Sequence, residues 1–276
     1  MLNTFNTGLD SYLSKDQIRT MAPVVFATEP TNKGVSDKYL HVNTETVVDD
    51  LAKLGWFPVT ASQRRTKARK DGSPTIRSKH MVSFQNPDLM IKGKNGDDAF
   101  PRIIVTNSHD GLCSFQFRVG IYRLVCSNGL VVADEEFSAF SIKHKGYTFE
   151  ELQTVVAQAV ADLPNKVVVL NKMQVRMLTA DEQRQLAIDA MSLRSSNPEA
   201  KYTDATIQEI LTATRKEDEG DSLWLVFNRI QESIINGGYH AALRGSKVRK
   251  VKKIQSFEKD LHVNQELFKL ATAYIN

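Results

Sequence analysis

The chain has 276 residues, of which 41% are hydrophobic and 25% are charged, and this composition is typical of a globular protein that can bury a core. No window approaches the roughly 18 apolar residues of a transmembrane helix, and the N-terminus lacks the regions of a signal peptide. Two cysteines, Cys113 and Cys126, are too few for a disulfide framework and fit a reducing compartment. We therefore expect a cytoplasmic protein that does not bind membranes.

The net charge of +4 conceals an uneven distribution of charge. Residues 62–80 carry seven basic side chains and one acidic one, and residues 240–256 carry six basic side chains and no acidic one. Since each of these two windows carries +6, the rest of the chain carries −8. A basic run can simply keep a loop solvated, but two runs on an acidic chain favour binding to a polyanion such as nucleic acid.

Residues 1–40 are rich in turn-forming residues and predict a loop or a flexible N-terminal arm. Residues 43–54 have the apolar spacing of a helix, which Asn43 or Thr44 can cap. Gly55 stands where a helix ends, because glycine adopts the left-handed conformation at low cost.

Strands are predicted from there to about residue 142, notably over 80–85, 102–107 and 112–126. Side chains along 112–126 alternate in character. The parity that contains Phe117 is mostly apolar and should pack on helices, whereas the parity of Arg118 and Tyr122 is polar and should face water or a ligand. The Asn128-Gly129 pair predicts a further hairpin.

The remainder is predicted to be helical, with Pro164 interrupting the first helix and a capping box at Thr179 and Glu182 opening the next. The order indicates an α+β fold with an N-terminal helix, an antiparallel sheet with long hairpins and a mostly helical C-terminal half. We divide it into an arm (1–40), an α+β core domain (41–195) and a helical region with a basic segment (196–276).

Catalytic and metal-binding patterns are weak. No glycine-rich phosphate loop occurs, and the six histidines have no metal-ligand spacing, so we predict no enzyme, cofactor or metal. Cys126 and His144 could form a nucleophile and base, but Cys126 also ends a strand before the Asn128 turn, and we favour this structural role. On the helix near residue 228, one side carries Trp224, Phe227, Asn228, Gln231 and Glu232, which we expect to join the core rather than bind a ligand.

The basic window 62–80 predicts a hairpin with arms 57–69 and 75–85 around a KDGSP turn. Alternation would place Arg65, Lys67 and Arg69 on one face, and Arg64 on the other. A strand of nucleic acid would be held by arginine and lysine at phosphates and by an aromatic ring at a base. The candidate DNA-binding residues are Arg64, Arg65, Lys67, Arg69, Lys70, Arg77, Lys79, Arg118, Tyr122, Arg123, Arg244, Lys247, Arg249, Lys250, Lys252 and Lys253.

Two resemblances add to these patterns. The segments YRLVCSNGLVV, FSIKHKGYT and LWLVFNRIQESIINGG resemble a family of phage- and plasmid-borne proteins classified only as a domain of unknown function. The succession of LAKLGW, a basic hairpin, further strands and a long helix resembles the single-strand annealing proteins of the Redβ, RecT, Erf and eukaryotic Rad type. That second resemblance implies ATP-independent binding of single-stranded DNA by a homo-oligomer, either a ring or a filament.

The sequence thus leads to two hypotheses. The first is a phage or plasmid protein that binds single-stranded DNA and anneals strands in recombination. The alternative is a phage-encoded interaction protein that inhibits a host defence system, with its basic patches on an acidic partner.

The double substitution of Arg64→Glu and Arg65→Glu tests the hairpin. We expect weaker binding of single-stranded DNA in gel shifts over a salt series, with the slope of log affinity against log salt reduced by about two, since two phosphate contacts are lost. Undiminished binding by the variant would show that the hairpin does not hold the DNA backbone.

Overall fold

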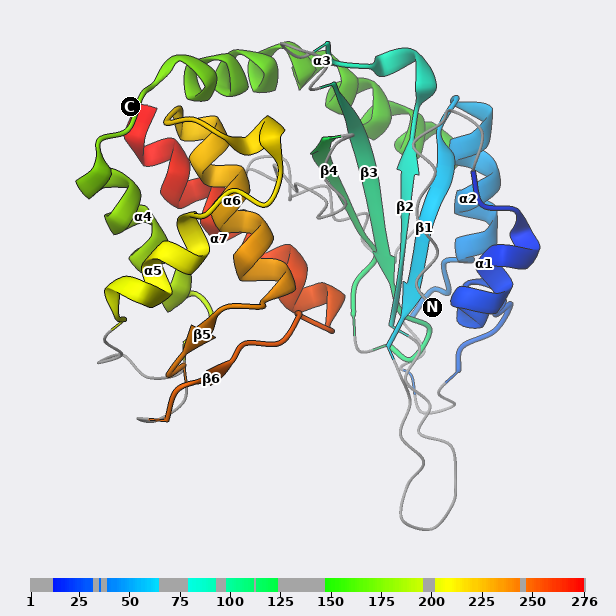
Figure 1. Ribbon diagram of the computed structural model, residues 1–276. Coiled ribbons are helices and arrows are strands. Elements are labelled where there is room, and N and C mark those ends of the chain that lie inside the picture. Colours follow the sequence, from blue (N-terminus) through cyan, green and yellow to red (C-terminus); the bar gives the residue numbers. More distant parts are fainter. Residues whose placement is uncertain are drawn as a thin grey trace. The chain divides into compact units, whose positions relative to one another are not determined.

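The computed structural model describes residues 12–31, 35, 39–64, 79–92, 98–111, 113–123, 147–195, 202–243 and 247–275. Their contacts divide the chain into two compact units (Figure 1). Unit 1 contains the described residues up to 123 together with 147–162, and unit 2 contains those from Leu163 onwards. The boundary between the two units falls inside a single helix, α3 (Phe149–Val175).

Unit 1 is built on a four-stranded antiparallel sheet in the order β1-β2-β3-β4. The strands are β1 (Phe57–Gln63), β2 (His80–Gln85), β3 (Ala99–Asn107) and β4 (Gln116–Arg123). Gln63 pairs with His80, and the Arg64 N–H donates to the carbonyl of Lys79 at 2.8 Å. The base of the predicted basic hairpin is therefore formed, while residues 65–78 lie outside the described residues, as does the hairpin predicted at Asn128.

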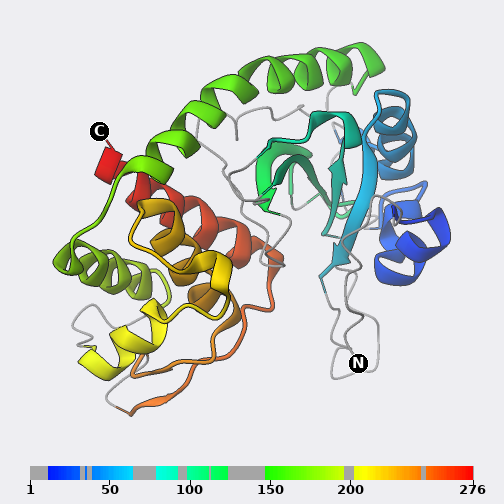
Figure 2. The same cartoon turned by 45° about the horizontal axis from the view of Figure 1, so that its top comes forward.

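Short helical elements join the sheet in unit 1, namely α1 (Lys15–Met21), η1 (Pro23–Phe26), α2 (Thr44–Lys53) and η2 (Pro87–Leu89). Helices α1 and α2 lie on the same side of the sheet, next to β1 (Figures 1 and 2). The Asn43 side chain caps α2 by accepting from the Glu45 N–H at 2.9 Å, as expected. Ile18 and Val25 are buried in the core, so these residues of the predicted arm belong to unit 1.

The alternation predicted for the long strand is confirmed. Phe115, Phe117 and Val119 are buried in the same core cluster as the helices and the first turns of α3. Arg118 and Tyr122 lie on the opposite face and are only partly buried. The fold of unit 1 is thus a sheet with one apolar, helix-covered face and a second face on which Arg118 and Tyr122 lie beside the buried Ile104 and Phe100.

Unit 2 is helical apart from a short two-stranded sheet. Besides the C-terminal turns of α3, its elements are α4 (Ala180–Ser192), α5 (Asp204–Leu211), η4 (Lys216–Asp218), α6 (Leu223–Asn236), β5 (His240–Ala241), β6 (Arg249–Lys250), α7 (Phe257–Thr272) and η5 (Ala273–Ile275). Helices α6 and α7 pack side by side (Figure 1). The capping box of α4 is present with both of its hydrogen bonds, from Thr179 and Glu182.

The interruption expected at Pro164 does not occur, because α3 continues through this residue. A proline inside a helix removes one backbone hydrogen bond, and the following turns compensate by burying apolar side chains at helical spacing. Leu163, Leu170 and Met173 are the buried residues of that stretch.

The polar side of α6 belongs to the core of unit 2, as predicted. Asn228 donates to a backbone carbonyl of its own helix at 2.6 Å, and Gln231 donates to Asn264 of α7 at 2.7 Å. Glu232 accepts from Arg215 at 2.6 Å and thereby ties the η4 loop to the helix. These side chains hold elements of unit 2 together.

The end of α6 makes a close backbone contact with the segment that follows β6. The Gly238 N–H donates to the Val251 carbonyl at 2.9 Å, and the Ile254 N–H donates to the Ile235 carbonyl at 2.9 Å. Gly237 has φ +71°, and a Cβ at this position would lie 2.4 Å from the Val251 carbonyl oxygen. Only glycine therefore allows the segment to approach α6 so closely.

Gly237→Ala should destabilise unit 2, with Gly238→Ala as the matched control. Both glycines have positive φ, so both substitutions cost backbone strain of roughly 1–3 kcal/mol. A Cβ at position 238 meets nothing within 4 Å, so only the Gly237 variant also has a clash with backbone. We expect a larger loss of unfolding free energy for Gly237→Ala in denaturant melts; equal losses would contradict the close contact.

Candidate nucleic-acid interface

The basic segment of unit 2, residues 247–253, is an anchored structure that we call the basic ribbon. Its strand β6 pairs with β5, with His240 opposite Lys250. Val251 and, just beyond, Ile254 are buried. The cations between and before these anchors are all exposed: Lys247, Arg249, Lys250, Lys252 and Lys253. Buried apolar residues thus fix a backbone that presents its charges to solvent.

Most cations of the ribbon form no ion pair within the part of the chain that the structure describes. Among the described residues, no carboxylate forms an ion pair with Lys247, Arg249, Lys250 or Lys252. Lys253 lies near Asp260, whose pKa burial raises to about 6 although the lysine opposes that rise. The four cations without an ion pair give this segment a positive local potential.

A half-buried arginine fixes the backbone of the ribbon. Arg194 donates to the Lys252 carbonyl at 2.8 Å and also to the carbonyl of Ile234 in α6. The ribbon is therefore held by side chain and backbone together, and its backbone needs little ordering when a ligand binds.

Of the first basic window, the structure describes two residues of the predicted set. Arg64 is exposed at the end of β1, and Lys79 is partly buried at the start of β2. The other predicted cations lie outside the described residues: Arg65, Lys67, Arg69, Lys70, Arg77 and, near the basic ribbon in sequence, Arg244.

On β4, the structure separates the three predicted residues. Arg118 and Tyr122 lie on the face of the sheet away from the α1 and α2 helices. Arg123 has the opposite parity and is only 3% exposed, so we remove it from the candidate interface. Arg102 of β3 was not predicted, yet its guanidinium lies 4.1 Å from the ring centroid of Tyr122.

Three histidines that are far apart in the sequence meet in unit 1. The ring of His109 lies 4.4 Å from that of His41 and 4.8 Å from that of His80, measured between centroids. The Nε2 atom of His80 lies 2.8 Å from Thr44 Oγ1. Burial and the two neighbouring rings lower the pKa of His109 to about 3. No spacing in the sequence signals this cluster, since each ring comes from a different segment.

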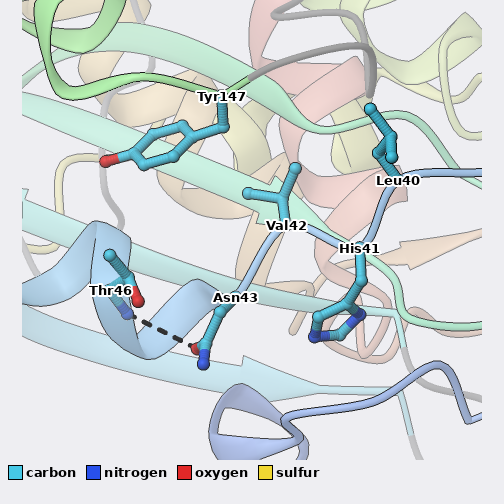
Figure 3. A pocket seen from close by; sticks show the side chains of 6 residues that line it. All are labelled: Leu40, His41, Val42, Asn43, Thr46 and Tyr147. Carbon is cyan, nitrogen blue, oxygen red and sulfur yellow. Dashed lines mark hydrogen bonds between the residues drawn. The ribbon is translucent and has the colours of Figure 1, made fainter.

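A pocket of about 320 Å³ adjoins the cluster at the N-terminus of α2 (Figure 3). Its lining residues are Leu40, His41, Val42, Asn43, Thr46 and Tyr147. The Tyr147 hydroxyl donates to Asp50 at 2.7 Å. Burial is the main cause that raises the pKa of Tyr147, and this hydrogen bond raises it further. Within the described ranges, no group of three His, Cys, Asp or Glu side chains could hold a metal ion.

None of the helices in the described part of the chain is long and apolar enough to cross a membrane. The fold and these surfaces define an α+β protein with an anchored, uncompensated basic ribbon. The family model for "Domain of unknown function (DUF932)" matches residues 33–268, and the chain belongs to this family. The resemblance to such a family, drawn from the three quoted segments, is thereby confirmed.

Two similar proteins come from Escherichia coli (strain K12). The UPF0380 protein YafZ is 28% identical over 266 residues, which cover 96% of this chain and 93% of the relative. The UPF0380 protein YfjQ is 28% identical over 262 residues, which cover 95% of this chain and 91% of the relative. No solved structure matches the chain.

Unit 1 should lose stability in acid because of His109. An unfolded histidine has a pKa of about 6.5, so the unfolded chain binds this proton more readily than the folded one. The stability is complete above about pH 6.5 and falls as the pH drops towards 3, by at most ~1.4 kcal/mol per pH unit for one proton. His41, His80 and Asp110 are the titratable neighbours that act on His109.

This pH dependence can be measured with Trp56 as the reporter of unit 1, after Trp224→Phe removes the other tryptophan, which lies in unit 2. His109→Gln should flatten the pH dependence of Trp56 unfolding. His262→Gln, at an exposed position, should not change it. An unchanged profile in the His109 variant would show that other groups control the acid sensitivity.

Proposed function

We propose that the protein is a phage or plasmid DNA-binding protein that binds single-stranded DNA without ATP and anneals complementary strands. The basic ribbon is the observation that carries this proposal. Cations that neutralise phosphates release condensed counterions, and this release drives binding that is independent of sequence.

The geometry of the ribbon supports a backbone ligand over a compact anion. Its cations are spread along seven consecutive residues, 247–253, of which Arg249 and Lys250 form strand β6, rather than gathered around a single pocket. A strand rises about 3.3 Å per residue, so charges along such a segment can match several phosphates.

The element order supports annealing as the outcome of binding. Helix α2 ends at Lys53 and is followed by Gly55 and Trp56, and then by the β1–β2 hairpin, β3, β4 and α3. This is the order on which the resemblance to the annealing proteins rests. Annealing also calls for several DNA-bound subunits, and we propose that the protein acts as a homo-oligomer.

Charge reversal of the ribbon is the direct test. Lys250→Glu with Lys252→Glu should weaken the binding of a labelled single strand by about a hundredfold near physiological salt and reduce the salt slope by about two. Fluorescence anisotropy over a salt series measures both quantities. Size measurement with and without the strand shows whether oligomers form.

The matched control is Lys172→Glu with Lys216→Glu, which changes the charge of unit 2 equally at exposed positions outside the ribbon. The control should bind almost as the wild type does. If the wild-type protein binds no single strand but captures an acidic protein through the ribbon, the alternative of an inhibitor of host defence replaces this proposal. A strict monomer with and without DNA would argue against annealing.

A further inference from the structure

The face of the unit 1 sheet that lies opposite to α1 and α2 has unusual chemistry for a packed surface. We call it the polar sheet face, and its defining residues are Ser83, Arg102, Thr106, Arg118 and Tyr122. The cross-strand register places Ser83 and Arg118 on either side of Ile104, so strands β2, β3 and β4 all contribute.

Both arginines of this face are partly buried. Arg102 stacks on Tyr122 and donates to Gln85 at 3.4 Å, and no carboxylate of the described residues pairs with Arg102 or Arg118. Burial lowers the pKa of both guanidinium groups. A buried charge is costly unless it is paired, so the face is electrostatically incomplete in the free protein.

Polar atoms of the same face also lack hydrogen-bond partners. The residues Ser83 and Thr106 are each only 1% exposed, and neither hydroxyl forms a hydrogen bond. The Nε atom of Arg118 is likewise buried without an acceptor. Buried polar groups are normally satisfied in folded proteins, and several unsatisfied donors on one surface indicate a ligand that supplies acceptors.

We propose that the polar sheet face binds a phosphodiester group of single-stranded DNA through the partly exposed Arg118, whose neighbours on the face are the buried hydroxyls of Ser83 and Thr106. A phosphate supplies the two features that the face lacks, which are negative charge and acceptor oxygens. Arginine suits it because the guanidinium donates two parallel hydrogen bonds to a phosphate. Arg102 and Tyr122 then form a planar platform beside the phosphate, on which a base can stack.

This inference rests on the proposed function but concerns a different surface from the basic ribbon, because it lies in unit 1. Stability separates a binding role of these residues from a structural one. A group that is kept for ligand binding at a cost in stability can be replaced without loss of stability, whereas replacing a group that holds the fold together destabilises the protein.

The test uses Arg118→Gln and Thr106→Val in the full-length protein, with Arg19→Gln as control. Arg19 is an exposed arginine of α1, on the opposite side of the sheet. With a thymidine oligonucleotide, Arg118→Gln should weaken binding about tenfold and lower the salt slope by about one. Thr106→Val should weaken binding severalfold, and the control should bind as the wild type does.

Thermal unfolding of the free proteins is the second measurement. Both polar-face variants should melt at the wild-type temperature or above it, because an uncompensated charge or an unsatisfied hydroxyl is removed. If they melt lower, the residues are structural and the inference is wrong.

The binding data also separate this inference from the proposed function. If Arg118→Gln binds normally while the ribbon variant Lys250→Glu with Lys252→Glu does not, only the polar sheet face is excluded. If the wild-type protein binds no single strand, both proposals fail. If inorganic phosphate raises the wild-type melting temperature through Arg118 but DNA does not, the site takes a small phosphorylated ligand and the DNA assignment is overturned.

Discussion

The side-chain period of two along the strands of the sheet is the constraint on which unit 1 depends. It places Phe117 and Val119 on one face with the helices, where each buried side chain contributes roughly 1.5–3 kcal/mol through removal from water. The same period places Arg118 on the other face. A shift of one residue would exchange the two faces, so the core itself determines where the arginines lie.

Unit 2 depends on a different device, in which backbone contacts fix a charged segment. Gly237 allows the chain after β6 to approach the end of α6, and Arg194 joins the two through carbonyl groups. These contacts are made to backbone atoms of the segment, so its exposed side chains remain available to solvent. Cations fixed in this way lose less conformational freedom on binding a polyanion than those of a mobile tail, and this supports the proposed role.

Much of the fold could be predicted because its signals are local. The Asn43 cap, the capping box at Thr179 and the alternation along β4 each depend on neighbouring residues, and each is confirmed. Pro164 shows where local signals fail, since α3 continues through it. Arg102 was missed because it lies on a short predicted strand without alternating polarity, and only the register of β3 with β4 places it beside Tyr122.

The sequence by itself determined the α+β class, the element order, the two basic windows and the membership of the family suggested by its motifs. These follow from composition and from patterns within a few residues of one another. Only the tertiary structure decided that Arg123 is buried, that His41, His80 and His109 meet, and that Ser83 and Thr106 lack partners. The physical reason is that burial and hydrogen-bond satisfaction depend on residues brought together by the sheet register and by packing, at separations no sequence period records.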